Sequence, residues 1–365
     1  MIELMSQTAI ATRALLEVQN LAVEFPGRRS VKAVDGVSLD IWPGEIVGLV
    51  GETGSGKTVL VTSILGLIRK PGRITEGSVM WRGRDLLRLP EKELRGIRGT
   101  EISMVFQNPL PSLNPSKRIG AQLRDLLIYH KLCDQHQAEE ETVALLHQVQ
   151  LPDPERVMKL YPFECSGGMC QRVLIAMALS GKPKLLIADE PTTSLDVTVQ
   201  AQIIRLILDL KREFGMAVLF VSHDLGVMAS ICDRVVVMYR GRIVESASSE
   251  DLFSSPSHPY TKALLRSSLL FAGRGSAENI GITIQEEVNF GLENSCGCRF
   301  HPRCPERLSE CQSAEPLLSL LPGSDSHWVA CFLNDRSADG KRGVDPGPLS
   351  KDDQPNPSTQ KSINC

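Results

Sequence analysis

Apolar and polar positions along the first 70 residues predict a succession of strand, turn and helix. Leu15–Phe25 alternates as a half-buried strand does, and Ala33–Ile41 is its expected partner, with the turn-forming pair Pro26-Gly27 between them. Glu45–Val50 is a short apolar run that ends at a glycine-rich turn. Thr58–Ile68 then has the length and spacing of a helix. We therefore expect a strand that leads through a glycine turn into a helix.

The middle of the chain predicts a helical insert followed by alternating helices and strands. Residues 122–159 carry helical periodicity with many polar positions. The elements expected after Ser166 are a helix (171–179), a strand (184–188), a helix (197–214), a strand (216–221) and a helical stretch around a Ser-Pro-Ser-His-Pro-Tyr break (251–269). This alternation predicts an α/β fold in which helices flank a mainly parallel sheet.

Composition narrows the class of protein. The 365 residues are 42% hydrophobic and 23% charged, which suits one large α/β domain and a smaller module. A formal net charge of −3 argues against a protein whose main task is to hold nucleic acid. No uncharged apolar stretch approaches the roughly 20 residues that span a bilayer, and the N-terminus lacks the features of a secretory signal. We expect a soluble chain with a loose arm over 1–14 and a disordered tail over 336–365.

The first motif with clear chemistry is a phosphate loop. Residues 51–58 match G-x-x-x-x-G-K-[ST] in full, between the predicted strand and helix, a position that argues against a chance glycine-rich turn. Glycines let backbone N–H groups turn towards phosphate oxygens, and the helix N-terminus favours the same anion. Lys57 is expected to reach the β- and γ-phosphates, and the Thr58 hydroxyl to bind Mg²⁺. The predicted ATP-binding residues of this loop are Gly51, Thr53, Gly54, Ser55, Gly56, Lys57 and Thr58.

A second motif follows the predicted strand at 184–188. Asp189 lies at the carboxyl end of that strand, where it can hold Mg²⁺ through water. Glu190 comes next and is placed to polarise an attacking water. An apolar run that ends in Asp-Glu is a weak signal by itself, and it becomes strong downstream of a phosphate loop.

A third motif predicts a second anion cradle. Ser166, Gly167 and Gly168 open a predicted helix just upstream of Asp189. One nucleotide does not need two cradles in one chain, so we expect this turn to serve the ATP of a partner subunit.

With these motifs in place, the chain resembles the nucleotide-binding subunits of ABC transporters over roughly residues 15–335. Each further match has a simpler structural explanation when taken alone, and the common order of the motifs supports the resemblance. In chain order the matches are Phe25 (the aromatic residue that stacks on adenine), the phosphate loop, Gln107 (the glutamine that senses Mg²⁺ and faces the membrane subunit), Ser166–Met169 (the signature motif), Asp189 and Glu190, Ser194-Leu195-Asp196 (the loop that crosses the dimer interface) and His223 (the switch histidine at the γ-phosphate).

The sequence departs from the family pattern on either side of the signature turn. Cys165 stands where the family usually has leucine, and Cys170 stands where close relatives usually have a basic residue. The small cysteine at position 165 is expected to loosen packing while it leaves the Ser-Gly-Gly cradle intact.

The resemblance implies a P-loop NTPase fold and a clamp mechanism. The nucleotide-binding domain would cover 15–265, with an antiparallel β subdomain and a helical subdomain at about 108–180, followed by a small cysteine-rich lobe over 266–335. Two such subunits would sandwich two ATP molecules, and closure would move a permease. The implied catalytic residues are Glu190, His223 and Gln107; the implied ATP contacts outside the phosphate loop are Phe25, Ser166, Gly167, Gly168 and Asp196; the implied Mg²⁺ ligands are Thr58, Gln107 and Asp189.

Three segments resemble the ATPase subunits of dipeptide and oligopeptide importers: 107–115, 187–202 and 258–264. Within that group, the stretches 33–37 and 97–99 look more like the first ATPase subunit than the second. The resemblance implies a second ABC ATPase, two transmembrane permeases and an extracytoplasmic solute-binding protein as partners, and no nucleic acid. It places the chain peripherally on the cytoplasmic face of the bacterial inner membrane. Relatives for nickel or glutathione keep the cargo open, because the ATPase does not touch the solute.

A cluster of cysteines near the C-terminus predicts a metal centre. The candidate ligands are Cys298, Cys304, Cys311 and Cys331, with Cys296 as a fifth. The C-x₂-C spacing usual for zinc fingers is absent, and some peptide-importer ATPases bind a [4Fe-4S] cluster in the segment that this one resembles. We favour that cluster over zinc and over free buried thiols.

Other classes of P-loop protein fit the sequence less well. A soluble ABC ATPase of DNA repair or translation would carry long coiled-coil insertions or two ATPase halves. A small-molecule kinase would lack the signature turn and the switch histidine. A regulatory subunit that binds ATP without turnover would not need Glu190.

Overall fold

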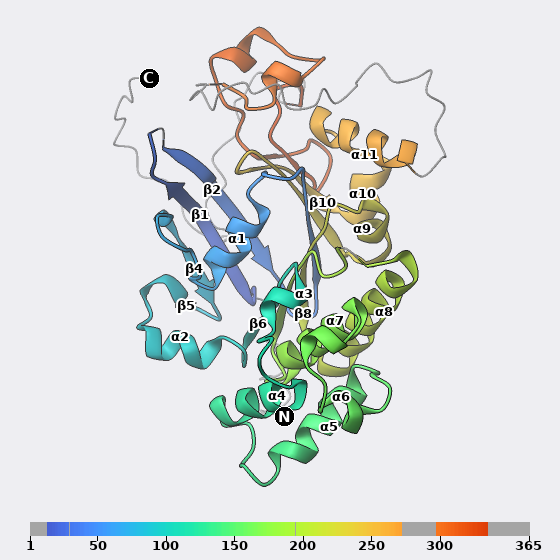
Figure 1. Ribbon diagram of the computed structural model, residues 1–365. Helices are drawn as coiled ribbons and strands as arrows, with labels where there is room; N and C mark the ends of the chain where they lie inside the picture. Colours follow the sequence, from blue (N-terminus) through green and yellow to red (C-terminus); the bar gives the residue numbers. More distant parts are fainter. Residues whose placement is uncertain (1–12, 29, 194, 272–296, 335–365) are drawn as a thin grey trace, which may run out of the picture.

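The protein consists of two sheets and their flanking helices, as seen in a computed structural model (Figure 1). Most of the predicted arm and the whole predicted tail lie outside the described residues, and so do Ser194 and Cys296. The structure describes residues 13–28, 30–193, 195–271 and 297–334.

The larger sheet has eight strands in the order β11-β12-β10-β9-β3-β8-β7-β6. It is parallel from β9 to β6 and antiparallel where β10, β12 and β11 extend it. Every residue of β3, β7 and β8 is buried, as expected for parallel strands covered on both faces. The strands are β3 (Ile46–Val50), β6 (Ile102–Val105), β7 (Leu185–Asp189), β8 (Ala217–Val221), β9 (Arg234–Tyr239), β10 (Arg242–Ser248), β11 (Ser319–Leu320) and β12 (Trp328–Val329).

The smaller sheet is antiparallel and has the order β2-β1-β4-β5. Its first two strands are the predicted pair, in a register that joins Leu16 to Ile41. The sequence analysis did not predict the other two strands. Their bounds are β1 (Leu16–Phe25), β2 (Val31–Ile41), β4 (Arg73–Trp81) and β5 (Arg84–Asp85). Both the antiparallel subdomain and the mainly parallel sheet of the predicted fold are thus confirmed.

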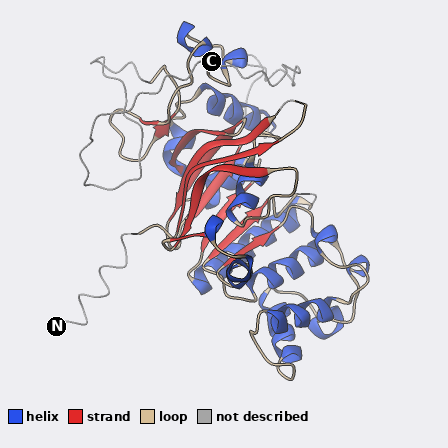
Figure 2. Ribbon diagram, turned by 90° about the vertical axis from the view of Figure 1, so that its left-hand side faces the viewer, coloured by secondary structure: helices blue, strands red, loops and turns tan. Residues whose placement is uncertain are grey.

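The helices lie beside the sheets and at one end of the molecule, where α4 to α6 gather far from the 297–334 segment (Figures 1 and 2). No helix in the described ranges is both long enough and apolar enough to cross a bilayer. The α-helices are α1 (Lys57–Ile64), α2 (Glu91–Ile97), α3 (Pro109–Ser112), α4 (Ile119–Tyr129), α5 (Ala138–Gln148), α6 (Pro154–Val157), α7 (Gly167–Leu179), α8 (Val197–Phe214), α9 (Leu225–Ile231), α10 (Ser249–Ser254) and α11 (Pro259–Phe271). Short 3₁₀ turns are η2 (Leu86–Arg88), η3 (Pro162–Glu164), η5 (His301–Arg303) and η6 (Ser309–Gln312).

Two predicted helical stretches are shorter or more broken than their periodicity suggests. The helix expected over 58–68 ends at Ile64, since Gly66 has a φ of +62° and stops the regular turn. The insert expected over 122–159 consists of three helices. Asp134 accepts backbone hydrogen bonds in the first break, and Asp153, with a φ of +50°, lies in the second. Polar residues that bond their own backbone compete with helix continuation.

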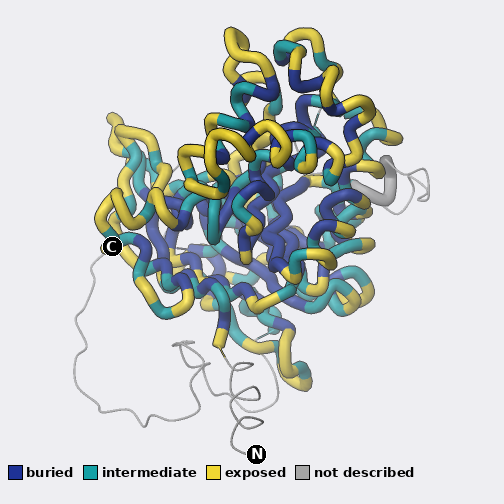
Figure 3. The backbone as a smooth tube through the Cα atoms, turned by 90° about the horizontal axis from the view of Figure 1, so that it is seen from below, coloured by how far each residue is buried: buried dark blue, intermediate teal, exposed yellow. Residues whose placement is uncertain are grey.

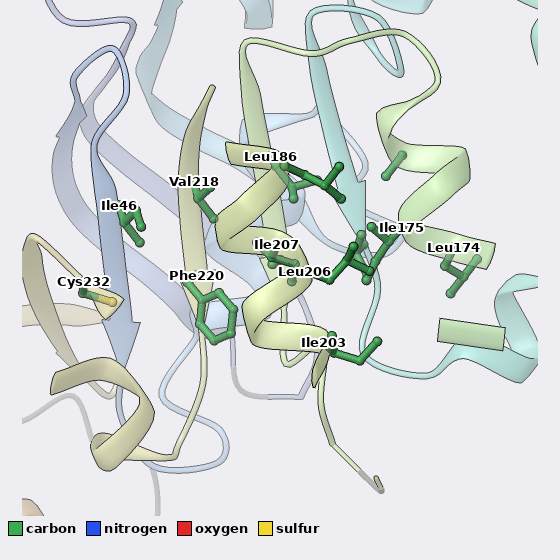
Figure 4. Packing of buried hydrophobic residues seen from close by; sticks show 14 of the residues in the cluster. Ile46, Leu174, Ile175, Leu186, Ile203, Leu206, Ile207, Val218, Phe220 and Cys232 are labelled. Carbon is green, nitrogen blue, oxygen red and sulfur yellow. The ribbon is translucent and has the colours of Figure 1, made fainter. Parts of the chain in front are cut away.

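Two apolar clusters form the core, one on each side of the large sheet. Helix α8 shows how the sequence builds one of them: Ile203, Leu206, Ile207 and Leu210 are buried at helical spacing. Figure 4 shows three of these residues over Val218 and Phe220 of β8. Asp196 caps the start of α8, and Gly215 ends it in the left-handed conformation. In Figure 3 the buried residues form a continuous centre under exposed rims.

Candidate functional site

The phosphate loop joins β3 to α1 and closely approaches two neighbouring backbone segments. A Cβ atom at Gly56 would lie 2.2 Å from the Ala33 carbonyl oxygen, and φ there is +102°. A Cβ atom at Gly51 would lie 2.2 Å from the Met238 carbonyl oxygen. Only glycine fits both positions, so the loop can keep its N–H groups turned inward.

Lys57 points into this loop. Its Nζ donates to the carbonyl oxygens of Gly51 and Glu52 at 2.7 and 3.0 Å. Burial lowers the pKa of Lys57, while the nearby Glu190 and Asp189 carboxylates oppose the shift. The ammonium is therefore held by weak acceptors that a phosphate oxygen can replace.

Asp189 provides an acidic group at the end of β7, beside the start of α1. Its side chain is buried, and the Thr58 hydroxyl bonds its carboxylate. Burial raises the pKa of Asp189, and the Oδ1 atom has no hydrogen-bond partner within the described residues. A buried carboxylate oxygen without a partner suits a divalent cation, so Thr58 and Asp189 fit the expected Mg²⁺ site.

Glu190 lies between side chains from two neighbouring strand ends. Gln107 Nε2 is 2.7 Å from Glu190 Oε2, and His223 Nδ1 is 3.6 Å from Glu190 Oε1. Gln107 follows β6 and His223 follows β8, on either side of β7 in the sheet. The carboxyl ends of adjacent parallel strands thus bring the three predicted catalytic side chains together.

Glu190 is also held in an unusual backbone conformation. Its φ is +46°, a region that non-glycine residues seldom occupy and that is found at functional sites. Thr193 donates its hydroxyl to the same carboxylate at 2.9 Å, a contact that the sequence analysis did not predict. In the sequence, the signal for this contact was a hydroxyl-bearing residue three positions after Glu190. Gln107 and Thr193 are thus the two donors that orient the carboxylate.

The signature turn lies apart from the phosphate loop. Ser166 caps α7, with its Oγ accepting from Met169 N at 3.2 Å, and Ser166 and Gly167 are exposed. Within the described part of the chain, no hydrogen bond or ion pair joins the turn to residues 51–58. A Cβ atom at Gly168 would lie 2.8 Å from Val199, so the turn adjoins the exposed Asp196 at the start of α8. These residues form an outward-facing surface.

Phe25 ends β1, where its ring is half-buried and packs against Gly72. The structure thus places this residue on the small sheet, with much of its ring already in contact with protein. Adenine stacking by Phe25 stays a prediction.

The two cysteines beside the signature turn occupy the N′ and N4 positions of α7, where apolar side chains pack together as a hydrophobic staple. Cys165 is half-buried and lies against the core, and Cys170 is fully buried. Burial raises the pKa of Cys170 to about 11, so its thiol stays protonated at neutral pH. Cys165 and Cys170 thus form a hydrophobic staple of two small side chains, and Ser166 still caps the helix.

The four described C-terminal cysteines line one cavity together with His258, Phe300 and His301. Burial raises the pKa of Cys331 to about 12, and the other three thiols add to that shift, which places all four near one another. Burial likewise raises the pKa of Cys298, and that of Cys304 to about 11. Across the described ranges, no set of three or more His, Cys, Asp or Glu side chains is arranged to hold a metal ion. The four thiols therefore line one cavity without forming a preorganised metal site.

Two protein-family models match the chain. The first, described as ABC transporter, matches residues 34–193, and the second, described as oligopeptide/dipeptide transporter, C-terminal region, matches residues 244–311. The first match includes every predicted site residue from the phosphate loop to Glu190, and the second includes Cys298, Cys304 and Cys311.

Similar curated proteins extend over nearly the whole chain. The oligopeptide transport ATP-binding protein OppD of Salmonella typhimurium is 46% identical over 335 residues, which are 90% of this chain and 98% of OppD. The dipeptide transport ATP-binding protein DppD of Bacillus subtilis is 44% identical over 333 residues, which are 89% of this chain and 96% of DppD. Among solved structures, the dimeric ATP-binding cassette MJ0796 in a post-hydrolysis state with ADP and Pi has a TM-score of 0.58 and 28% identity, covering 64% of this chain and 98% of its own.

Proposed function

The chain belongs to the ABC transporter family of ATP-binding subunits, and from that premise we propose that it powers the uptake of di- or oligopeptides through partner permeases. As an ABC ATPase it binds and hydrolyses ATP. The curated relatives that match nearly all of the chain are named for oligopeptide and dipeptide transport, which supports peptides over nickel or glutathione. The single observation that carries the assignment of the reacting centre is the convergence of Gln107 and His223 on Glu190.

The described residues suggest how one half of the reaction is organised. Lys57 and the loop N–H groups would bind the β- and γ-phosphates, and Thr58, Asp189 and Gln107 would hold Mg²⁺, which neutralises phosphate charge. Glu190, oriented by its two donors, would accept a proton from the attacking water. His223 is 67% exposed, so it can turn towards the γ-phosphate.

The other half of the site would come from a second ATPase subunit. Ser166, Gly167 and Asp196 are exposed and, within the described residues, make no hydrogen bond to the chain's own phosphate loop, as expected if they complete the site of a partner. The similar cassette MJ0796 was solved as a dimer. Each ATP would then lie between the phosphate loop of one subunit and the signature turn of the other, which couples ATP affinity to closure.

The permease partner would dock beside the helical insert. Gln107 is exposed and lies next to two exposed apolar side chains, Phe106 and Leu110, which are 42% and 53% accessible. A groove on the same insert is lined by Arg118 and Tyr161, among others. A surface of this kind suits a short helix from a membrane subunit, so we infer a peripheral position on the cytoplasmic face of the membrane.

The four C-terminal thiols are the proposed site of a metal centre. All four thiols line one cavity, and the resemblance of this segment to peptide-importer ATPases favours a [4Fe-4S] cluster there over zinc. The residues that would hold it are Cys298, Cys304, Cys311 and Cys331, which must first lose their protons. The centre would clip a segment that has little regular structure.

Membrane association tests this function against a soluble role. The full chain should sediment with membranes from cell lysate and be released when the permeases are absent. A Leu110→Asp variant should move to the soluble fraction, whereas Leu317→Asp, which changes an equally exposed leucine in the C-terminal segment, should not. A chain that stays soluble and binds DNA with steep salt dependence would instead support the repair class.

A further inference from the structure

An ion pair joins the phosphate loop to the C-terminal segment. Glu52, the second residue of the loop, accepts two hydrogen bonds from Arg303, which lies 251 residues further along the chain. Arg303 Nη1 is 2.9 Å from Glu52 Oε2, and Nη2 is 2.9 Å from Oε1. The two side chains are only 18% and 28% exposed. This parallel, two-pronged geometry is the strongest form of an arginine–carboxylate contact.

Arg303 is itself held in place by aromatic rings. Its guanidinium carbon lies 5.8 Å from the ring centre of Tyr239 and 5.9 Å from that of Phe300. The two rings meet edge to face with their centres 5.3 Å apart. Stacking on aromatic faces fixes the orientation of the guanidinium, so its fork points at Glu52 at little cost in side-chain entropy.

The backbone of Glu52 has a second anchor on α11. The Tyr260 hydroxyl accepts the Glu52 N–H at 2.8 Å, and the Tyr260 side chain is completely buried. Its ring packs on Tyr239 and Phe300, with centres 4.6 and 5.5 Å away, so it belongs to the same aromatic cluster. The phosphate loop is thus held at one residue by both a side-chain and a main-chain contact.

These contacts reach the group that binds phosphate. The carbonyl oxygen of Glu52 accepts a hydrogen bond from Lys57 Nζ at 3.0 Å. The N–H, the carbonyl and the carboxylate of Glu52 are therefore all engaged, the N–H by Tyr260 of α11 and the carboxylate by Arg303 of the C-terminal segment. A loop with three glycines loses much conformational freedom when it closes on an anion, and an anchor that orders it beforehand lowers that cost.

We propose that Arg303 and Tyr260 are positioning residues for ATP, which act through Glu52 to hold the phosphate loop in its binding shape. The inference rests on the proposed nucleotide site and adds a role for the C-terminal segment within it. Neither residue touches the reacting centre formed by Glu190, so their loss should weaken ATP binding far more than it slows turnover.

The test is binding of a fluorescent ATP analogue with Mg²⁺ to the purified full chain. Arg303→Ala should raise Kd roughly three- to tenfold, as expected when about 1 kcal/mol of preorganisation is lost. Arg303→Lys keeps the charge but loses the two-pronged contact, so its Kd should lie between those of the wild type and Arg303→Ala. Tyr260→Phe keeps the ring and should raise Kd roughly twofold. Arg307→Ala is the matched control, because Arg307 is exposed in the same segment and makes no ion pair to any described residue.

A double-mutant cycle shows whether Arg303 acts through Glu52. The Glu52→Gln, Arg303→Ala double variant should bind no more weakly than Arg303→Ala alone, since both changes break one contact. Steady-state hydrolysis should show the same rise in KM, with kcat within about twofold of the wild type. Thermal unfolding, measured in parallel, reports any general loss of stability.

Four outcomes separate the positioning role of Arg303 from the nucleotide site on which it rests. If the wild type fails to bind the analogue, the nucleotide site itself is wrong. If the wild type binds and Arg303→Ala binds as tightly as Arg307→Ala, the site stands and the positioning role is wrong. A lower unfolding temperature with an unchanged Kd, or additive effects of Glu52→Gln and Arg303→Ala, would equally reduce Arg303 to a structural residue.

Discussion

Gln107 Nε2 lies 2.7 Å from Glu190 Oε2, although the two residues are 83 positions apart in sequence. The contact spans the ends of two adjacent parallel strands, β6 and β7. Gln107 is exposed on the side where a membrane subunit is proposed to dock, whereas Glu190 is 16% exposed and lies at the reacting centre. One hydrogen bond therefore connects the docking surface to the group that would activate water.

Removing the Gln107 amide should uncouple Glu190 from that surface. Gln107→Ala leaves Thr193 as the remaining donor to the carboxylate, so we expect ATP turnover by the assembled transporter to fall about tenfold, which corresponds to about 1.4 kcal/mol. Turnover is measured at saturating ATP and Mg²⁺, so that the loss of the proposed Mg²⁺ contact of Gln107 does not limit it. Gln148→Ala, which changes a half-buried glutamine bonded to Glu213, is the control. Equal turnover in both variants would contradict the orienting role.

The close approach of Gly56 to Ala33 predicts a strong effect of a single methyl group. Gly56→Ala places a Cβ atom 2.2 Å from a carbonyl oxygen at a φ of +102°, so the loop must shift, at a cost of about 2 kcal/mol or more. We expect the variant to unfold at lower denaturant concentration and to lose ATP binding. Gly96→Ala in α2 is the control, because nothing lies within 4 Å of its Cβ position and φ is ordinary there. That change should leave stability equal or about 0.5–1 kcal/mol higher.

The phosphate loop, the buried strands and the Asp189-Glu190 pair could be predicted because each depends on local order along the chain, whereas Gln107 and His223 were indicated by the family resemblance. A glycine-rich turn between strand and helix specifies its own shape, and strand ends in a parallel sheet meet at one edge. Breaks in the helical insert were missed, because Asp134 and Asp153 act through their own backbone rather than through periodicity. Arg303 and Glu52 could not be paired from sequence, since their contact spans 251 residues and depends on how β10, β12 and α11 fold back.

The hydrophobic staple at the signature turn can be enlarged by substituting Cys165. Cys165→Leu adds apolar atoms at the N′ position of α7, opposite the buried Cys170 at N4. We expect the free energy of unfolding to rise by about 0.5–1 kcal/mol, since the new atoms are only partly buried. Cys133→Leu, a change at another half-buried cysteine outside any staple, should stay within about 0.5 kcal/mol of the wild type. A clear loss of stability in Cys165→Leu would mean that the site is already filled.

Metal content tests the cysteine cavity. The full chain purified without oxygen should contain about four iron atoms and a similar amount of acid-labile sulfide. Cys304→Ala removes a thiol that lines the cavity and should lose most of both, whereas Cys133→Ala should keep them. One zinc per chain would support the zinc alternative. The absence of both iron and zinc would support free buried thiols.

Peptide uptake by intact cells tests the central claim most directly. Cells that carry only the Glu190→Gln variant should take up labelled di- and oligopeptides at least a hundredfold more slowly than cells with the wild-type chain, because the base that activates water is gone. Glu250→Gln, a change at an exposed glutamate outside the site, should leave uptake intact. Unchanged uptake in Glu190→Gln cells would contradict the account: if the purified complex still hydrolyses ATP, the cargo is another solute, and nickel or glutathione should be measured next.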